Sequence, residues 1–334
     1  MSSRSGATDL ATVPGGPAVA TGGRALVRPP RAGRRQWSWR KTAELVALIG
    51  PAAALFVMFV LAPIAVAVYY SLYRWSGFGP LTDMVGLHNY AFAIKDPDFR
   101  TAVSHNLIIA ALSVLIQLPI SICLALLLNR KIRGRAALRL VVFSPYVLSE
   151  AITAVIWLLF LQPGGFVDEV MRDLGVGSLI HPWLADQSLV LYTLFVVITW
   201  KYIGFGIILL LAGLQGIPSE LHEAAALDGA TGWQATRRIT LPLLGPTIRI
   251  WIFLSVIGSL QLFDLVWIMT LGGPANASST MSVYMIDHGF RRYQFGYGSA
   301  VAVIVFVICF VFALLYQRFA LRRDTAGALT QAVN

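Results

Sequence analysis

The sequence predicts an all-α, polytopic membrane protein with six transmembrane helices. Of its 334 residues, 57% are hydrophobic and only 13% are charged, a balance that soluble domains seldom reach. The apolar residues also gather in runs, and a helix needs about 20 apolar residues to cross a bilayer. Six runs reach that length, at residues 43–72, 103–128, 137–161, 189–214, 248–271 and 299–319.

Basic residues are distributed unequally between the two sides of the predicted bundle. Nineteen of the 26 Lys and Arg residues fall in or beside the termini and the loops after the second and fourth spans, whereas six fall in the other loops. Cytoplasmic loops are enriched in Lys and Arg. Both termini and the loop at residues 215–247 are therefore predicted to be cytoplasmic.

The apolar and polar stretches divide the chain into four parts. Residues 1–41 are rich in Gly, Pro, Ala and Arg without a regular period, which predicts a disordered basic cytoplasmic tail. The first transmembrane helix, at residues 42–72, is too long for the apolar region of a cleaved signal peptide, about 7–15 residues. A core of five transmembrane helices follows at residues 73–320, and residues 321–334 form a second cytoplasmic tail.

The cytoplasmic loop at residues 215–247 is predicted to hold two short helices joined by a glycine turn. Ser219 is placed to cap the first helix, and Gly229 is free to adopt the positive φ that ends it. Thr231 and Gln234 form a capping-box pattern at the start of the second helix. Pro242 is expected to end that helix, because its ring removes a backbone donor.

This loop resembles a known motif. Two short sequences, Glu-Ala-Ala at 223–225 and Asp-Gly-Ala at 228–230, precede Pro242 and Pro246 at the spacing of the EAA motif. The motif is typical of permease subunits of bacterial ABC importers, and this variant is similar to the maltose and glycerol-phosphate uptake branch. The resemblance implies the type I ABC importer permease (MetI-like) fold, in which this loop is a coupling helix that docks on an ATPase subunit. It assigns that contact to Glu223, Ala224, Ala225, Asp228, Gly229 and Ala230.

The resemblance also implies partners and a location. We expect a second permease chain, two ATP-binding ABC subunits, an extracytoplasmic solute-binding protein and membrane lipid, and no nucleic acid. The location would be the bacterial plasma (inner) membrane. No cofactor is expected on this chain, because none of its four lysines follows a glycine and a phosphate-cradling GK[ST] loop is absent. ATP would be used by the partner subunits, so this chain is not expected to be an enzyme, and its five histidines show no metal-ligand spacing.

Two charged residues fall inside predicted spans, where charges are rare and need a partner or a function. Glu150 lies near the middle of the third span and Lys201 near the middle of the fourth, at about the same depth. An ion pair between them is the simplest prediction. Such a pair either fixes helix packing or lines the translocation path.

Polar residues on two other spans predict a solute path. Asn106 and Gln117 share one face of the second span, and Gln261, Asp264 and Trp267 form roughly one stripe of the fifth. Amide groups and an aromatic ring complement the hydroxyls and the apolar C–H face of a sugar. The candidate path residues are therefore Gln261, Asp264, Trp267, Asn106, Gln117, Glu150 and Lys201.

Two other classes of protein remain as alternatives. A self-contained secondary transporter could use Glu150 and Lys201 as a proton or ion relay, but the sequence shows no internal repeat with paired broken helices. A membrane-embedded enzyme would need a nucleophile and a base within the spans, and none is visible. The identity of the solute stays open at this point.

Overall fold

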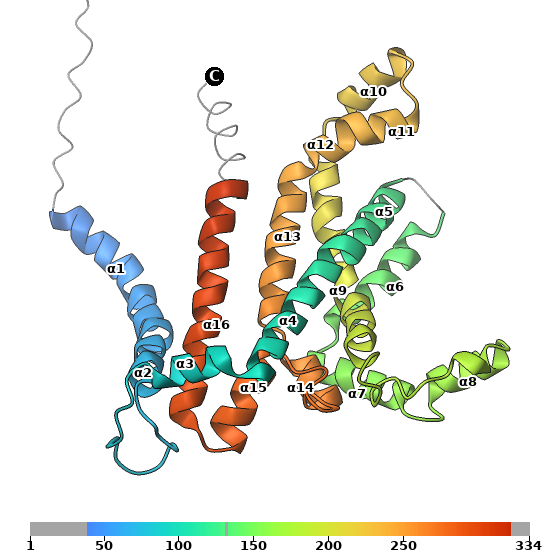
Figure 1. Cartoon of the computed structure of the whole chain (residues 1–334). Coiled ribbons are helices and arrows are strands. Elements are labelled where there is room, and N and C mark those ends of the chain that lie inside the picture. The colour runs from blue at the N-terminus through green and yellow to red at the C-terminus, as the bar shows by residue number, and fades with distance from the viewer. Residues whose placement is uncertain (1–38, 131–132, 322–334) are drawn as a thin grey trace, which may run out of the picture. The chain divides into compact units, whose positions relative to one another are not determined.

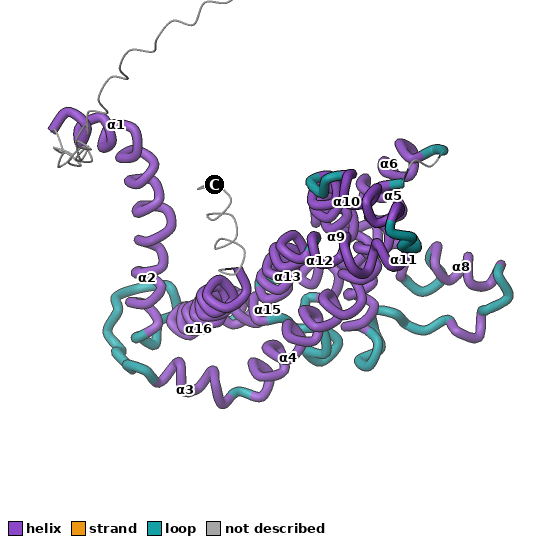
Figure 2. The backbone as a smooth tube through the Cα atoms, turned by 90° about the horizontal axis from the view of Figure 1, so that it is seen from above, coloured by secondary structure: helices purple, strands orange, loops and turns teal. Residues whose placement is uncertain are grey.

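The computed structural model describes residues 39–130 and 133–321, and their regular structure is helical apart from one isolated bridge between Tyr73 and Met84 (Figure 1, Figure 2). The prediction of an all-α fold is therefore confirmed. The predicted tails lie outside the described residues, except for residues 39–41 at the start of the first helix and residue 321 at the end of the last helical turn.

The chain divides into two compact units, residues 1–56 and residues 57–334. The described part of the first unit is α1, Trp39–Phe56. The α-helices of the second unit are α2 (Ala62–Ser71), α3 (His88–Lys95), α4 (Pro97–Leu112), α5 (Leu118–Asn129), α6 (Arg135–Val147), α7 (Glu150–Leu161), α8 (Phe166–Asp173), α9 (Val190–Gln215), α10 (Ser219–Leu227), α11 (Gly232–Ala235), α12 (Leu241–Leu243), α13 (Gly245–Leu260), α14 (Asp264–Thr270), α15 (Met281–Ile286) and α16 (Phe295–Tyr316). Shorter π-helical turns lie at Val57–Leu61, Ser113–Gln117, Thr236–Thr240, Asp287–Arg291 and Gln317–Leu321, and a 3-10 turn lies at Gly177–Leu179.

Within the described residues, four helical segments are long and apolar enough to cross a membrane: Val46–Ser71, Pro97–Asn129, Val190–Gln215 and Phe295–Ala320. Two bent helix pairs supply a further candidate each. They are Arg135–Val147 with Glu150–Leu161, bent by 101°, and Gly232–Leu243 with Gly245–Leu260, bent by 62°. The described chain thus has four to six candidate spans, and the prediction of six is the upper end of that range.

Helix breaks correct the predicted continuous spans at residues 137–161 and 248–271. Leu148 and Ser149 have extended backbone and separate α6 from α7. Residues 261–263 lie outside both α13 and α14 and separate them. The predicted spans came from apolar run length, which tolerates isolated polar residues such as Ser149 and Gln261, so the breaks were not predicted.

Helix α9 is the centre of the second unit. In its most apolar window 56% of the residues are buried, against 33% for the span formed by α4 and α5. It packs against α5, α6 and α13 (Figure 1). Gly204 allows the approach of α6, since a Cβ atom there would lie 2.7 Å from the carbonyl oxygen of Val142. Gly206 likewise allows the approach of α13, since a Cβ atom there would collide with the indole nitrogen of Trp251.

Candidate functional site

A cavity of about 350 Å³ lies among α4, α6, α7, α9, α13 and the start of α14. Its neutral polar side chains are Ser113, Gln117, Ser255, Ser259 and Gln261. Its aromatic side chains are Tyr146, Tyr202, Phe205, Trp251 and Phe263. Its acidic side chains are Glu150 and Asp264.

Both helix breaks lie beside this cavity: residues 261–263 line it, and so do Tyr146 and Glu150 on either side of the first break. Glu150 is the first residue of α7, and Asp264 is the first residue of α14. A carboxylate in the first turn is favourable, because the unpaired N–H groups there carry a partial positive charge. Ser149 caps α7 by accepting a hydrogen bond of 3.2 Å from the Ile152 amide. Non-helical backbone inside a membrane is tolerated where it is buried in protein or borders a cavity, because its polar groups then need not face lipid. The position of the breaks beside the cavity is consistent with that rule.

Lys201 is buried behind the cavity wall, with only 3% of its surface exposed. Its ammonium group donates hydrogen bonds to the carbonyl oxygens of Pro145 at 3.2 Å, Tyr146 at 3.1 Å and Leu148. Carbonyl groups at the end of a helix lack partners within that helix. Lys201 therefore supplies the donors that the end of α6 needs.

The predicted ion pair between Glu150 and Lys201 is wrong: among the described residues none joins them. The carboxylate of Glu150 instead accepts a short hydrogen bond from the hydroxyl of Tyr202, the neighbour of Lys201 on α9. The physical reason is the break, which frees three carbonyl groups beside the ammonium group and gives Glu150 a place at the start of the next helix.

The structure places four of the predicted path residues in the cavity lining: Gln117, Glu150, Gln261 and Asp264. The other three, Asn106, Lys201 and Trp267, are not part of that lining. Since a new helix begins at Asp264, the expected stripe along one helix is not formed.

Asn106 and Trp267 have structural contacts. Asn106 is fully buried and donates to the carbonyl oxygen of Ser259 at 2.6 Å, while it accepts from the Met281 amide at 2.9 Å. It thereby ties α4 to α13 and α15. Trp267 stacks on Phe263 with ring centroids 5.5 Å apart, and the guanidinium of Arg291 lies 5.9 Å from its ring.

Sequence reasoning missed the pair of Tyr146 and Phe205, which stack at 5.3 Å and form part of the cavity wall. The sequence did carry a signal for the helix break beside this pair, because Ser149 and Glu150 follow Pro145 within five residues. A Ser with an acidic residue directly after it is a helix-start signal, and here it marks the break.

The cytoplasmic loop was predicted largely correctly. Gly229 has φ +77°, and Thr231 and Gln234 form a reciprocal capping box with hydrogen bonds of 2.8 and 3.3 Å. Two details are wrong. The cap of α10 is Pro218, and Ser219 is its first helical residue without a capping bond. Pro242 does not end the second helix but lies in the first turn of α12, which begins after the π-helical turn at residues 236–240. Proline is tolerated in the first turn of a helix, because the backbone N–H group that it lacks has no partner there.

The residues of the EAA motif lie in an elbow beyond the start of α13 (Figure 1). Glu223, Ala224, Asp228 and Gly229 are exposed, Ala230 is half-buried and Ala225 is buried. His222 holds the two arms of the elbow together through a contact of 3.1 Å between its Nε2 and the hydroxyl of Thr240.

Two large apolar side chains on this elbow were not anticipated. Leu227 is 90% exposed and Trp233 is 70% exposed, one on each side of the glycine turn. Tryptophan is enriched at protein–protein interfaces relative to the rest of the surface. The signal for Trp233 was in the sequence, since an aromatic residue two positions after a capping threonine in a polar loop has no core to enter.

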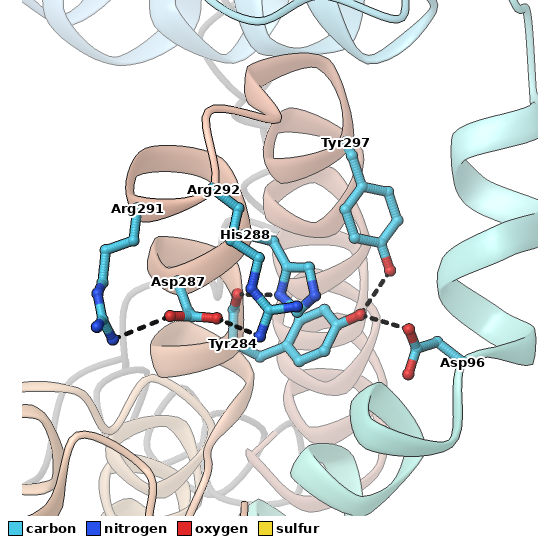
Figure 3. Close-up of polar contacts among 7 residues, drawn as sticks. All are labelled: Asp96, Tyr284, Asp287, His288, Arg291, Arg292 and Tyr297. Carbon is cyan, nitrogen blue, oxygen red and sulfur yellow. Dashed lines mark hydrogen bonds and ion pairs between the residues drawn. The ribbon is translucent and has the colours of Figure 1, made fainter.

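A polar network around α15, at the end of the helices opposite to the elbow, was also not predicted from the sequence (Figure 1, Figure 3). Tyr284 donates to the carboxylate of Asp96 at 2.9 Å, and its hydroxyl lies 2.7 Å from that of Tyr297. The ring of His288 stacks on Tyr284 at 4.0 Å, and its Nδ1 lies 3.1 Å from the Tyr284 carbonyl oxygen. Burial lowers the pKa of His288 below its ordinary value of 6.5, so the neutral ring is favoured. Asp287 pairs with Arg291 at 3.1 Å and Arg292 at 2.8 Å to complete the group.

Asp168 on α8 fixes the loop between α7 and α9. It accepts hydrogen bonds from the Gly164 amide at 2.8 Å and the Trp183 indole at 3.1 Å. These two donors stabilise the carboxylate and hold the pKa of Asp168 below its ordinary value.

Comparison with known proteins places this geometry in a family. The family model of the binding-protein-dependent transport system inner membrane component matches residues 117–325. The diacetylchitobiose uptake system permease protein NgcF of Streptomyces coelicolor is 31% identical over 90% of this chain and 88% of its own length. The trehalose/maltose transport system permease protein MalF of Thermococcus litoralis is 30% identical over 83% of this chain and 94% of its own. A crystal structure of a bacterial ABC transporter that imports the acidic polysaccharide alginate shares the fold, with a TM-score of 0.74, 24% identity, and coverage of 85% and 96%.

The chain belongs to the family of binding-protein-dependent ABC transporter permeases, in its carbohydrate-uptake branch. It is a multi-pass inner-membrane protein and the permease subunit of an importer whose ATP hydrolysis resides in partner subunits.

Proposed function

We propose that the cavity at the two helix breaks is the place where a carbohydrate crosses this subunit. The observation that carries the proposal is its lining, which combines hydroxyl and amide groups with aromatic rings. A saccharide presents hydroxyls at its edge and apolar C–H groups on its faces, so both kinds of group complement it. The volume of about 350 Å³ also lies within the range of small-molecule sites, about 300–1,000 Å³.

The exposed elbow is the proposed contact with an ATP-binding subunit. Glu223, Asp228 and Gly229 of the EAA motif are exposed there, as are Leu227 and Trp233. Closure of the ATP-binding subunits would move this elbow, and α12 and α13 would carry the movement toward the cavity. Two ATP-binding subunits, a second permease chain and an extracytoplasmic solute-binding protein would complete the complex. One related crystal structure is an alginate ABC transporter in complex with a periplasmic protein bound to an alginate pentasaccharide, which supports the last of these.

The charge distribution supports one orientation of the chain. The elbow and both termini would lie in the cytoplasm of a bacterial cell, since the basic residues concentrate on that side. A self-contained transporter with a relay between Glu150 and Lys201 is not favoured, because these residues have separate partners, the Tyr202 hydroxyl and backbone carbonyl groups.

Co-purification tests the docking role. We expect the tagged chain, extracted in mild detergent, to bring down an ATP-binding subunit and a second permease chain. Gly229→Asp should abolish recovery of the ATP-binding subunit, because it adds a charged side chain to the turn at the centre of the contact. Gly175→Asp is the matched control, since Gly175 has a similar φ of +75° in a turn with open space around it, far from the elbow. Equal recovery with both variants would refute docking through this turn.

A further inference from the structure

The charges around the cavity separate two classes of solute. Among the described residues that line it, Glu150 and Asp264 supply the only carboxylate groups, and no lysine, arginine or histidine is present. The remaining polar groups are the hydroxyls and amides of serine, tyrosine and glutamine, together with one indole. An anionic group is usually bound by arginine or lysine in charge-assisted hydrogen bonds. Nothing in this lining offers that chemistry.

The nearest cation does not cancel the two acids. Lys201 lies behind the wall, and its ammonium group is already bonded to three carbonyl oxygens at the end of α6. Even if its full charge is counted, two carboxylates against one ammonium leave one negative charge.

The helix ends do not change this balance. At each break the carbonyl end of one helix meets the amide end of the next, α6 before α7 and α13 before α14. These ends carry partial charges of about −0.5 and +0.5, which cancel to first order. The potential in the cavity is therefore set by the side chains, and it is negative.

We infer that this cavity admits saccharides that are uncharged or carry an ammonium group, and rejects saccharides that carry phosphate, sulfonate or carboxylate. The inference rests on the proposed function, because it assumes that the cavity is the solute path. Family membership does not decide whether the solute is neutral or anionic. One relative is the diacetylchitobiose uptake system permease protein NgcF, and another, 30% identical, is the sn-glycerol-3-phosphate transport system permease protein UgpA of Agrobacterium fabrum.

The sign of the potential can be measured without knowing the solute. Gly258 lines the cavity, is exposed, and has open space where a Cβ would lie, so Gly258→Cys presents a thiol to the cavity. The background carries Cys123→Ala and Cys309→Ser, which remove the two native thiols. The full chain, purified with its partner subunits in lipid nanodiscs, is treated with two methanethiosulfonate reagents of similar size. One carries a trimethylammonium group and the other a sulfonate.

We expect the cationic reagent to modify residue 258 faster than the anionic one. The ratio of the cationic to the anionic rate should be at least about tenfold higher than the same ratio for a small free thiol such as 2-mercaptoethanol. The matched variant adds Glu150→Gln and Asp264→Asn, which keep shape and remove both charges, and it should bring the ratio back to that of the free thiol. A ratio equal to that of the free thiol in the charged cavity would overturn the inference. So would a ratio that the two neutral substitutions leave unchanged.

A second position separates failure of the inference from failure of the proposed function. Ser255→Cys is nearly isosteric and lies in the same lining. If neither reagent modifies residue 258 or residue 255, small solutes do not reach the cavity, and the proposed solute path fails together with the inference. If both positions react without charge preference, the path stands and only the inference fails.

Discussion

Replacing Lys201 by methionine tests the account of the break between α6 and α7. The substitution keeps the apolar stem and removes the group that donates to three carbonyl oxygens. A hydrogen bond to a charged group contributes about 1.5–3 kcal/mol, and losing the charge also relieves its burial, so the contributions do not simply add. We expect a net loss of about 2–4 kcal/mol in the free energy of unfolding. For a chain of 334 residues that corresponds to a fall in Tm of roughly 3–6 °C.

The assay is thermal unfolding of the purified protein in detergent, followed by size-exclusion chromatography with fluorescence detection. Lys95→Met is the matched control, because Lys95 is exposed at the end of α3 and its loss should change Tm little. A double substitution with Glu150→Gln distinguishes the two accounts of Lys201. If Lys201 serves the carbonyl groups, Glu150→Gln restores almost nothing, since those groups still lack donors. Recovery of wild-type stability in the double variant would refute this reasoning and reinstate the ion pair.

Two further predictions concern the ends of the helices. Trp233→Ala should weaken binding of the ATP-binding subunit by about 2 kcal/mol, roughly 30-fold, while changing the free energy of unfolding by less than about 0.5 kcal/mol, because the ring is 70% exposed. Microscale thermophoresis with the purified ATP-binding subunit measures the first value, and an unchanged affinity would contradict the docking role of this ring. The second prediction is that His288 makes the protein less stable at acidic pH. Burial lowers the pKa of His288 in the folded protein below 6.5, so the unfolded chain binds a proton at a higher pH than the folded chain does. The free energy of unfolding should therefore fall as the pH is lowered from about 7 to 5. Tm measured across that range should decline less in His288→Asn, which keeps an N–H donor without titrating, and equal declines would show that other groups are responsible.

The sequence was sufficient for features that depend on local rules. Apolar run length located the four continuous candidate spans, and the capping box at Thr231 and Gln234 and the glycine turn at Gly229 were predicted from short patterns with known geometry. These elements depend on residues close together in the chain. The local geometry of the exposed elbow is therefore where prediction and structure agree best.

The cavity was only partly predictable, for a different reason. Depth along a span can be estimated from sequence, and it placed Glu150 and Lys201 at a similar level. The partner that each residue takes depends on the break at Leu148 and Ser149, which apolar run length does not mark. Once the break frees carbonyl groups, they compete for Lys201, and a rule based on opposite charges no longer applies.

The network around Tyr284 lay beyond sequence reasoning altogether. Its hydroxyl meets Asp96, which is 188 positions away in the chain, and no local pattern marks such a contact. Each member, taken singly, is an ordinary tyrosine, histidine or aspartate. Only the packing of α15 and α16 against the start of α4 brings them together.

Helix α13 joins the two parts of the molecule that are proposed to act in transport, the exposed elbow and the cavity. One end leads through α12 to the elbow, and the other ends at Leu260, directly before the cavity residue Gln261. With 16 residues it is about 24 Å long, so a tilt of roughly 10° displaces one end by about 4 Å relative to the other. Residues 261–263 are already non-helical, and α14 need not follow that tilt. A displacement smaller than one helical turn at the elbow is thus enough to change the width of the cavity without breaking any hydrogen bond inside a helix.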